Sequence, residues 1–425
     1  MNSTLYHFIW DGKPDKVKRL TLCSDYSVGG LKMINVNNFE KGIKISWIKR
    51  LLTNQTSQWY ELIKGICPNI DNILIFGDGW CKTILNSITN PFWINVLEYW
   101  NKFCEIQRSQ KTDEILTTCI WYNSDIFKSP TLFPDWYKKG IYLIGDISDS
   151  SGEILNFDQL NLKYNGNFNI LNFYTVRQGI KNFASKQTEI TPSMTYEKPA
   201  YPGHLKILIK SKDGTKMFYS LFNSVMMEKP LCENIWQPLL LTQYCEAELA
   251  DKFKLLYKIC FKTIEDNELI WFQYRILYKI LGTNDYLKKT NISQTDECNL
   301  CWQDIQNIKH LFSECTKVKC LWQNLRNWIA NKIGVNITLD SVTKILGYLQ
   351  FDQYFWPLNF ILIITRKYIF WCCRNNFPFD IYFLQKEVKR KYSEQETLYK
   401  IKGCGNIFSK RWSLWKNIFN DIESF

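Results

Sequence analysis

The chain has 425 residues, of which 46% are hydrophobic and 16% aromatic, and its formal net charge is +12. A chain of this length can form two or three separate cores, and its apolar content excludes a disordered polymer. The positive charge favours an anionic partner, either nucleic acid or an acidic membrane surface.

Fifteen cysteines are spaced irregularly along the chain. Small secreted proteins stapled by disulfides concentrate their cysteines in a short sequence, so this pattern favours free thiols in a reducing compartment. The opening residues lack the basic and apolar regions of a secretory signal. We therefore expect an intracellular protein of the nucleus and cytoplasm.

The first fifty residues are predicted to form a basic turn and then a long amphipathic helix. Apolar side chains recur every four residues between residues 39 and 51, which predicts one apolar stripe with the lysines elsewhere on the helix. Such cations suit a phosphate-binding face or simply a solvated surface. The predicted stripe is Phe39, Ile43, Trp47 and Leu51, and the candidate phosphate contacts are Lys13, Lys16, Lys18, Arg19, Lys41, Lys44, Lys49 and Arg50.

The middle of the chain alternates short helical patterns with turns. Two β-rich runs flank Asp213 and Gly214, and this turn pair predicts a β-hairpin over residues 204–222. Helical periodicity returns after residue 236, most clearly over 246–264 and 268–284.

The longest apolar run, residues 355–373, carries Arg366 and Lys367 near its middle. Charges are costly at the centre of a bilayer, so this run predicts a buried helix and no membrane span. A basic run follows it, with Trp412 and Trp415 further along the chain. Its candidate phosphate contacts are Lys386, Lys389, Arg390 and Lys391.

The densest set of potential metal ligands lies in the stretch CNLCWQDIQNIKHLFSEC. Cys298 and Cys301 suit a tight turn that places two thiolates on one ion, and His310 and Cys315 follow at the start of a predicted helix. Histidine is scarce, with three in the chain, and one of them falls in this window. The alternative interpretation is that these cysteines are packed core residues.

Four protein ligands would close the coordination shell, so the predicted cofactor is a structural Zn²⁺ ion with no open position for catalytic water. Cys320, five residues beyond Cys315, is an alternative ligand. The sequence contains no Asp-Asp pair, no Gly-Lys-Ser/Thr phosphate loop, no Gly-x-Ser-x-Gly elbow and no His-Glu-x-x-His pair. We therefore expect that this chain alone is not an enzyme.

The opening of the chain contains a Trp-x-Gly-Lys-Pro piece, a Lys-Arg pair, a Gly-Gly-Leu turn and a helix that ends in Trp-Ile-Lys-Arg-Leu. This order resembles the segment after the polymerase palm in reverse transcriptases of LINE-type non-LTR retrotransposons. The stretches LTTCIWYNSDI and DWYKKGIYLIGDISDSSGEILNFDQL resemble the connecting region of that family. The matching opening residues are Trp10, Gly12, Lys13, Pro14, Lys18, Arg19, Gly29, Gly30, Leu31, Trp47, Ile48, Lys49, Arg50 and Leu51.

The later stretch HLFSECTKVKCLW, with the cysteines before it, is similar to the cysteine-rich carboxyl-terminal motif of the same family. By this resemblance the ligand set is Cys298, Cys301, His310 and Cys315. The catalytic palm and the endonuclease of the family have no counterpart in the sequence. The resemblance therefore implies a thumb and carboxyl-terminal fragment that binds RNA and DNA and has no polymerase site of its own.

These observations predict a mainly α-helical, multi-helix nucleic-acid-binding fragment with a small β-hairpin portion and a Cys3His zinc-knuckle-like motif. The expected partners are template RNA, target DNA and the palm-containing part of a parent protein, with no membrane. The alternative is a helical protein-interaction module whose cysteines belong to the core. The expected segments are a thumb-like helical region (1–140), a connecting region with the hairpin (141–235), a helical zinc-binding region (236–335) and a basic helical region (336–425).

Overall fold

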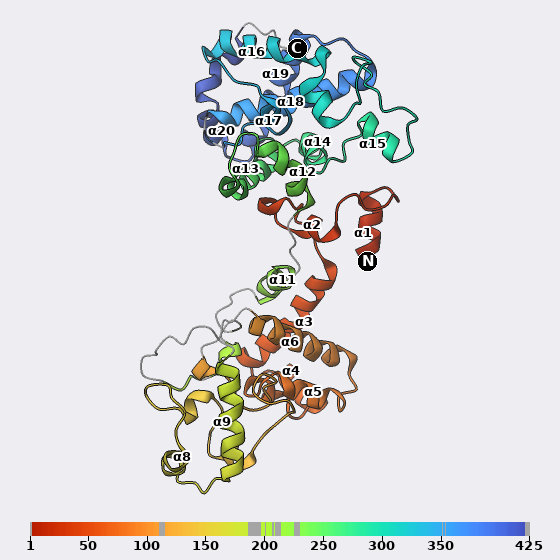
Figure 1. Ribbon diagram of the computed structural model, residues 1–425. Coiled ribbons are helices and arrows are strands. Elements are labelled where there is room, and N and C mark those ends of the chain that lie inside the picture. The colour runs from red at the N-terminus through yellow and green to blue at the C-terminus, as the bar shows by residue number, and fades with distance from the viewer. Residues whose placement is uncertain are drawn as a thin grey trace. The chain divides into compact units, whose positions relative to one another are not determined.

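The protein is mainly helical, as predicted, in a computed structural model (Figure 1). No β-strand occurs among the residues that the structure describes, where β pairing is limited to isolated bridges such as that between Cys119 and Leu143. The described residues are 2–109, 115–185, 197–199, 201–205, 208, 214–224, 230–350, 352 and 354–420.

Two compact units make up the chain, and each has its own core. Unit 1 comprises Met1–Asn2 and Ile34–Met226, and unit 2 comprises Ser3–Met33 and Met227–Phe425. The four segments expected from the sequence divide the chain at other positions, because segment 1–140 includes residues of both units. These segments stay a prediction.

Unit 1 is organised around one long helix, α3, against which α6 and α11 pack. Its core is rich in aromatic rings, among them Trp100, Phe103 and Phe218. Its described helices are α3 (Val36–Thr53), α4 (Gln58–Ile66), η2 (Ile70–Leu74), α5 (Asp78–Leu85), α6 (Pro91–Ser109), η3 (Ile115–Thr117), α7 (Pro134–Lys138), η4 (Ile144–Ile147), α8 (Phe157–Tyr164), α9 (Ile170–Ala184), η5 (Gly203–Leu205) and α11 (Gly214–Ser224).

The predicted β-hairpin is wrong over the residues that can be compared. Gly214 begins helix α11 instead of closing a turn, whereas Asp213 lies outside the described residues. Phe218 and Phe222 are four residues apart and both are buried. This spacing places both rings on one face of a helix, and packing of that face against α3 outweighs the local turn signal.

The buried face of α3 differs from the predicted apolar stripe. Phe39 and Ile43 are exposed by 43% and 41%, whereas Ile45 and Ile48 are fully buried. Gly42 explains the difference, because a side chain there would press on the backbone of α11. Helix α11 therefore packs along the line of Gly42 and leaves part of the predicted stripe exposed.

Unit 2 is built around α18, which packs against η7 and against the helices α14, α17 and α19 that Figure 1 labels. Its described helices are α1 (Asn2–Ile9, of which Asn2 is assigned to unit 1), α2 (Arg19–Cys23), η1 (Tyr26–Val28), α12 (Leu231–Leu240), η6 (Glu246–Glu248), α13 (Leu249–Lys262), α14 (Asn267–Leu277), α15 (Asn284–Lys289), η7 (His310–Glu314), α16 (Thr316–Ile333), α17 (Ser341–Leu346), α18 (Phe355–Asn375), α19 (Ile381–Ile401), α20 (Gly405–Arg411) and η8 (Ser413–Phe419).

Helix α18 is the buried helix that the apolar run predicts. Arg366 is fully buried within it, and its guanidinium donates to Gln273 Oε1 at 3.1 Å and to the Lys344 carbonyl at 3.3 Å. These bonds offset part of the cost of burying a charge. Among the described residues, no helix combines the length and apolar character needed to cross a membrane.

The segment Ser3–Met33 belongs to unit 2 although about two hundred residues separate it from the rest of that unit. Trp10 and Leu22 are buried in the unit 2 core. Gly29 has a φ of +79°, and its carbonyl accepts a 2.7 Å hydrogen bond from the Tyr278 hydroxyl. A side chain at Gly30 would overlap the Ser24 carbonyl, so the chain turn requires glycine at this position.

Candidate metal centre and basic surfaces

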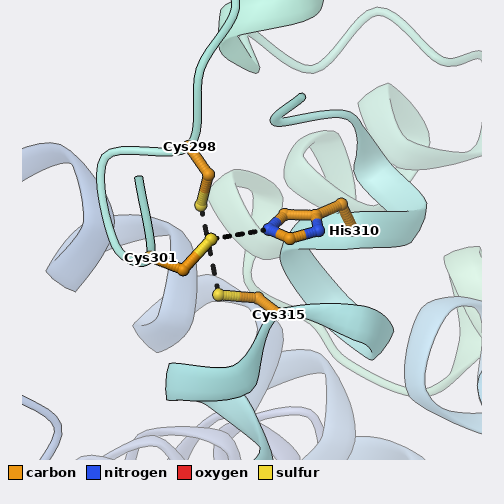
Figure 2. A group of neighbouring side chains, drawn as sticks. All are labelled: Cys298, Cys301, His310 and Cys315. Carbon is orange, nitrogen blue, oxygen red and sulfur yellow. Dashed lines mark hydrogen bonds between the residues drawn. The ribbon is translucent and has the colours of Figure 1, made fainter. Parts of the chain in front are cut away.

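Four potential metal ligands converge in unit 2 (Figure 2). The donor atoms of Cys298, Cys301, His310 and Cys315 all lie within 4.8 Å of one another. Cys298 Sγ is 4.0 Å from Cys315 Sγ, and Cys301 Sγ is 3.3 Å from His310 Nε2. In a tetrahedral site with metal–sulfur bonds of about 2.3 Å, two sulfurs lie about 3.8 Å apart. The arrangement can therefore hold one metal ion.

A tight turn supplies the first two ligands. The Trp302 N–H donates to the Cys298 carbonyl at 2.9 Å, and the Cys298 N–H donates to the Asp304 carbonyl at 2.8 Å. Glu297 and Ile305 form an isolated antiparallel bridge across the base of this turn. The reversal of the chain brings the Cys298 and Cys301 sulfurs to the same side.

A π-helical turn, η7, supplies the other two ligands. The Cys315 N–H donates to the His310 carbonyl at 2.8 Å, so one turn spans five residues. In an α-helix of 3.6 residues per turn, side chains five apart point in different directions. The wider turn allows His310 and Cys315 to face the same point, and Cys315 then caps α16.

The site favours a thiolate at Cys298. Cys298 and Cys315 are fully buried, and the hydrogen bond between them lowers the pKa of Cys298 and raises that of Cys315. The Gln306 side chain also donates to Cys298 Sγ at 3.8 Å. Because metals bind the deprotonated thiol, this environment prepares Cys298 as a ligand.

Polar neighbours orient the imidazole of His310. Its Nε2 faces Cys301, and its Nδ1 lies 3.6 Å from Asp304 Oδ2. A carboxylate beside the second ring nitrogen is the usual partner of a metal-bound histidine. Sequence reasoning did not identify Asp304 or Gln306, because ligand spacing does not reveal which intervening side chains turn inward.

The other nearby cysteines lie outside the group. Cys320, the alternative to Cys315, is exposed on α16. Cys373 is buried in α18, where burial raises its pKa to about 11 and Gln306 donates to its sulfur at 3.1 Å. Cys372 is buried as well, as expected of a core residue. The cysteine placement therefore selects Cys315 as the fourth candidate ligand.

The predicted phosphate contacts are divided between the two units. Lys41, Lys44, Lys49 and Arg50 lie on α3 in unit 1, and the remaining eight lie in unit 2. Lys44 pairs with Glu40 at 2.6 Å on the surface of its own helix. Further contacts include those of Arg19 with Asp15, Lys41 with Asn38, Lys16 over the Tyr286 ring and Arg50 over the Trp47 ring.

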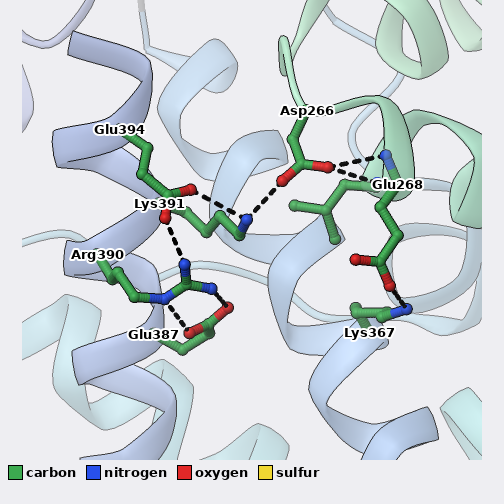
Figure 3. Close-up of polar contacts among 8 residues, drawn as sticks. Asp266, Glu268, Lys367, Glu387, Arg390, Lys391 and Glu394 are labelled. Atoms are coloured by element: carbon green, nitrogen blue, oxygen red, sulfur yellow. Dashed lines mark hydrogen bonds and ion pairs between the residues drawn. The ribbon is translucent and has the colours of Figure 1, made fainter. Parts of the chain in front are cut away.

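Two of the α19 candidates take part in an ion-pair network (Figure 3). Arg390 pairs with Glu387 and Glu394, and Lys391 bridges Glu394 and Asp266. Asp266 caps the start of α14, so Lys391 connects α19 to α14. The Lys391 side chain is 14% exposed. Within the described structure, Lys391 therefore links α19 to the start of α14.

No protein-family model and no curated protein matches the chain, so comparison with known proteins assigns it to no family. The family resemblance of the opening segment stays a prediction.

Proposed function

We propose that the chain is a nucleic-acid-binding, carboxyl-terminal fragment of a LINE-type retrotransposon reverse transcriptase. In this role it holds template RNA and target DNA while a palm domain elsewhere copies the RNA. The fragment itself carries no polymerase site. RNA, DNA and the palm-containing part of the parent protein are its partners.

The observation that carries the proposal is the convergence of three thiols and one imidazole from residues 298–315. Sulfur and imidazole ligands suit zinc, and a four-ligand shell is typical of structural zinc. The proposed role of the ion is to fix the turn before η7 against α16 and α18. The same four residues form the ligand set that the family resemblance implies.

The opening segment supports the proposal independently. Its Trp10 side chain is buried, and its Gly29 and Gly30 make a turn that other residues would strain. The cations Lys13 and Lys18 of the same segment are exposed to solvent. An exposed basic turn is suited to phosphate contacts.

The rival function is a helical protein-interaction module, and one observation counts against part of the basic surface that distinguishes the proposed function from it. Arg390 and Lys391 are engaged with carboxylates of their own unit. A phosphate would have to compete with these carboxylates, so the two residues are poor candidates for direct contacts. Protein binding without nucleic-acid binding would support the rival.

Binding of single-stranded RNA to the purified full chain tests the proposal. About four phosphate contacts predict that affinity falls about 50-fold between ~50 and ~200 mM salt. Fluorescence anisotropy over a salt series measures this slope. Absence of binding at the lowest salt would contradict the proposed function.

Metal content is measured on the same preparation. We expect one zinc ion per chain, and cobalt substitution should give the absorption of thiolate coordination. A chain that folds, binds RNA and contains no zinc would retain the nucleic-acid function but contradict the structural role of the ion.

A further inference from the structure

Four aromatic rings are exposed where α18 turns into α19. Trp371 lies in the last turn of α18, Phe377 follows that helix, and Tyr382 and Phe383 lie in the first turn of α19. Their exposed fractions are 45%, 54%, 41% and 61%. Rings gathered in one short stretch of surface indicate an interaction site more strongly than scattered apolar residues do. We name residues 371–389 the α18–α19 corner.

Two of these rings form a stack at the surface. The centroids of Trp371 and Phe377 are 5.0 Å apart, and the ring planes differ by 19°. Asn376 ends α18 in the left-handed conformation with a φ of +53°, and the Phe377 N–H donates to the Cys372 carbonyl at 3.0 Å. This backbone turn folds the Phe377 ring back over the end of the helix. The exposed stack can accept a further flat ring.

The charge of the corner complements a polyanion. Lys386 Nζ lies 4.6 Å from the centroid of the Tyr382 ring, and Lys389 follows one turn later on α19. The corner contains the cations Arg374, Lys386 and Lys389 against two carboxylates. Of these carboxylates, Asp380 accepts the Tyr382 N–H at 2.7 Å as the cap of α19, and Glu387 is ion-paired with Arg390 on the same helix. Cations beside aromatic rings suit a chain of stacked bases and phosphates.

Contacts with residues around the candidate metal centre hold the α18–α19 corner in place. Gln306 donates to Cys373 at 3.1 Å and also to the ligand Cys298. The Arg374 guanidinium donates to the Gly282 carbonyl. The last turn of α18, which carries Trp371, is therefore fixed from two sides.

We propose that the α18–α19 corner is a platform on which unpaired bases of single-stranded nucleic acid stack. Trp371 and Phe377 provide the stacking face, and Lys386 and Lys389 lie beside the adjoining phosphates. The inference rests on the proposed function and specifies its ligand. Bases of a duplex are already stacked on one another, so the platform selects single strands, with little preference for sequence.

The test compares the full chain with the double variant Trp371→Ala, Phe377→Ala. The probes are an oligouridylate of about 12 nucleotides and an RNA duplex of similar length. We expect the double variant to bind the single strand at least about tenfold more weakly, because one stacked base is lost. Its affinity for the duplex should stay within about twofold, because phosphate contacts to the duplex are unchanged.

Two further variants distinguish the loss of a stacking ring from a loss of the fold. Phe8→Ala removes a ring that is 85% exposed on α1, outside the corner, and should leave both affinities unchanged. Phe383→Ala removes the most exposed ring of the corner and should weaken single-strand binding about threefold while the melting temperature is retained. A circular-dichroism melt confirms the fold of every variant.

The outcomes separate this inference from the proposed function. Single-strand affinity within twofold of the parent in both corner variants would overturn the platform and leave the proposed function standing. A parent chain that binds neither probe at low salt would overturn both. If the corner variants bind RNA normally but lose self-association in light scattering, the corner is a contact between copies of the chain.

Discussion

Cys315 and Cys320 are five residues apart, and only the first has its sulfur in the metal-binding group. We expect Cys315→Ser to lose the bound metal and to destabilise unit 2 by about 3 kcal/mol, or roughly 6–12 °C in melting temperature. Cys320→Ser is the matched control and should retain both metal and stability. Elemental analysis and calorimetry measure the two effects, and equal metal content in the two variants would exclude Cys315 as a ligand.

Lys391 is expected to stabilise the fold with little effect on nucleic-acid binding. Lys391→Ala breaks the partly buried contact between α19 and Asp266 and should cost about 1 kcal/mol of stability. RNA affinity should change less than about twofold, because the ammonium group of Lys391 is already paired with Asp266 and Glu394. Lys389→Ala, on the same helix, is the comparison variant and should weaken RNA binding. If Lys391→Ala instead loses RNA affinity and keeps its melting temperature, Lys391 is a phosphate contact.

The same contact predicts a pH dependence. Burial alone would raise the pKa of Asp266, but the hydrogen bond from Lys391 and the N–H groups of α14 lower it overall. The stabilisation is therefore present above the unfolded pKa of about 3.9 and is lost as the pH falls further. A stability profile in which the difference between the parent and Lys391→Ala shrinks as the pH falls below about 3.9 would agree, and a difference that stays constant would contradict this account.

Individual site residues were predictable where the chemistry is local. The candidate ligands Cys298 and Cys301 lie on one short turn, and His310 and Cys315 lie on the next, so the spacing of these residues predicted that they lie close together. The engagement of Lys391 with Asp266 was not predictable, because it joins residues 125 positions apart. The sequence of a basic run does not show which distant carboxylates will lie beside it in the folded chain.

Among the structural elements, the Gly29–Gly30 turn should be highly sensitive to substitution. Gly30→Ala places a methyl group against the Ser24 carbonyl and should destabilise unit 2 by about 2–4 kcal/mol. Gly405→Ala, in the same unit, meets only a flexible lysine side chain at ordinary contact distance and should be nearly neutral. Denaturant unfolding of both variants measures the difference. A neutral Gly30→Ala would show that the turn is not formed as described.

Helix positions were predictable from periodicity, but the faces that they bury were less so. Residues 355–373 were identified as a buried helix because nearly every position is apolar. The face of α3 was partly mispredicted because Gly42 carries no hydrophobic signal, yet it allows α11 to approach closely. The hairpin was mispredicted for a related reason. An Asp-Gly pair is a local signal, and the packing of Phe218 and Phe222 is not local.

For the whole molecule, the division into two units predicts separable stability. A chain that lacks residues 3–33 should retain a folded unit 1, whereas unit 2 should lose several kcal/mol because Trp10 and Leu22 leave its core. Adding residues 3–33 as a separate peptide should restore part of the lost stability. Calorimetry of the truncated chain with and without the peptide measures this, and loss of the unit 1 transition would contradict the division.

The early position of residues 3–33 also affects how the protein is made. The ribosome delivers this segment before unit 1, and its partners beyond residue 227 emerge only after unit 1 has been synthesised. At about 5–20 residues per second, that interval lasts roughly 10–40 seconds. Throughout this interval Trp10 and Leu22 lack the core residues that bury them in the folded chain, so these apolar side chains should stay exposed on the nascent chain.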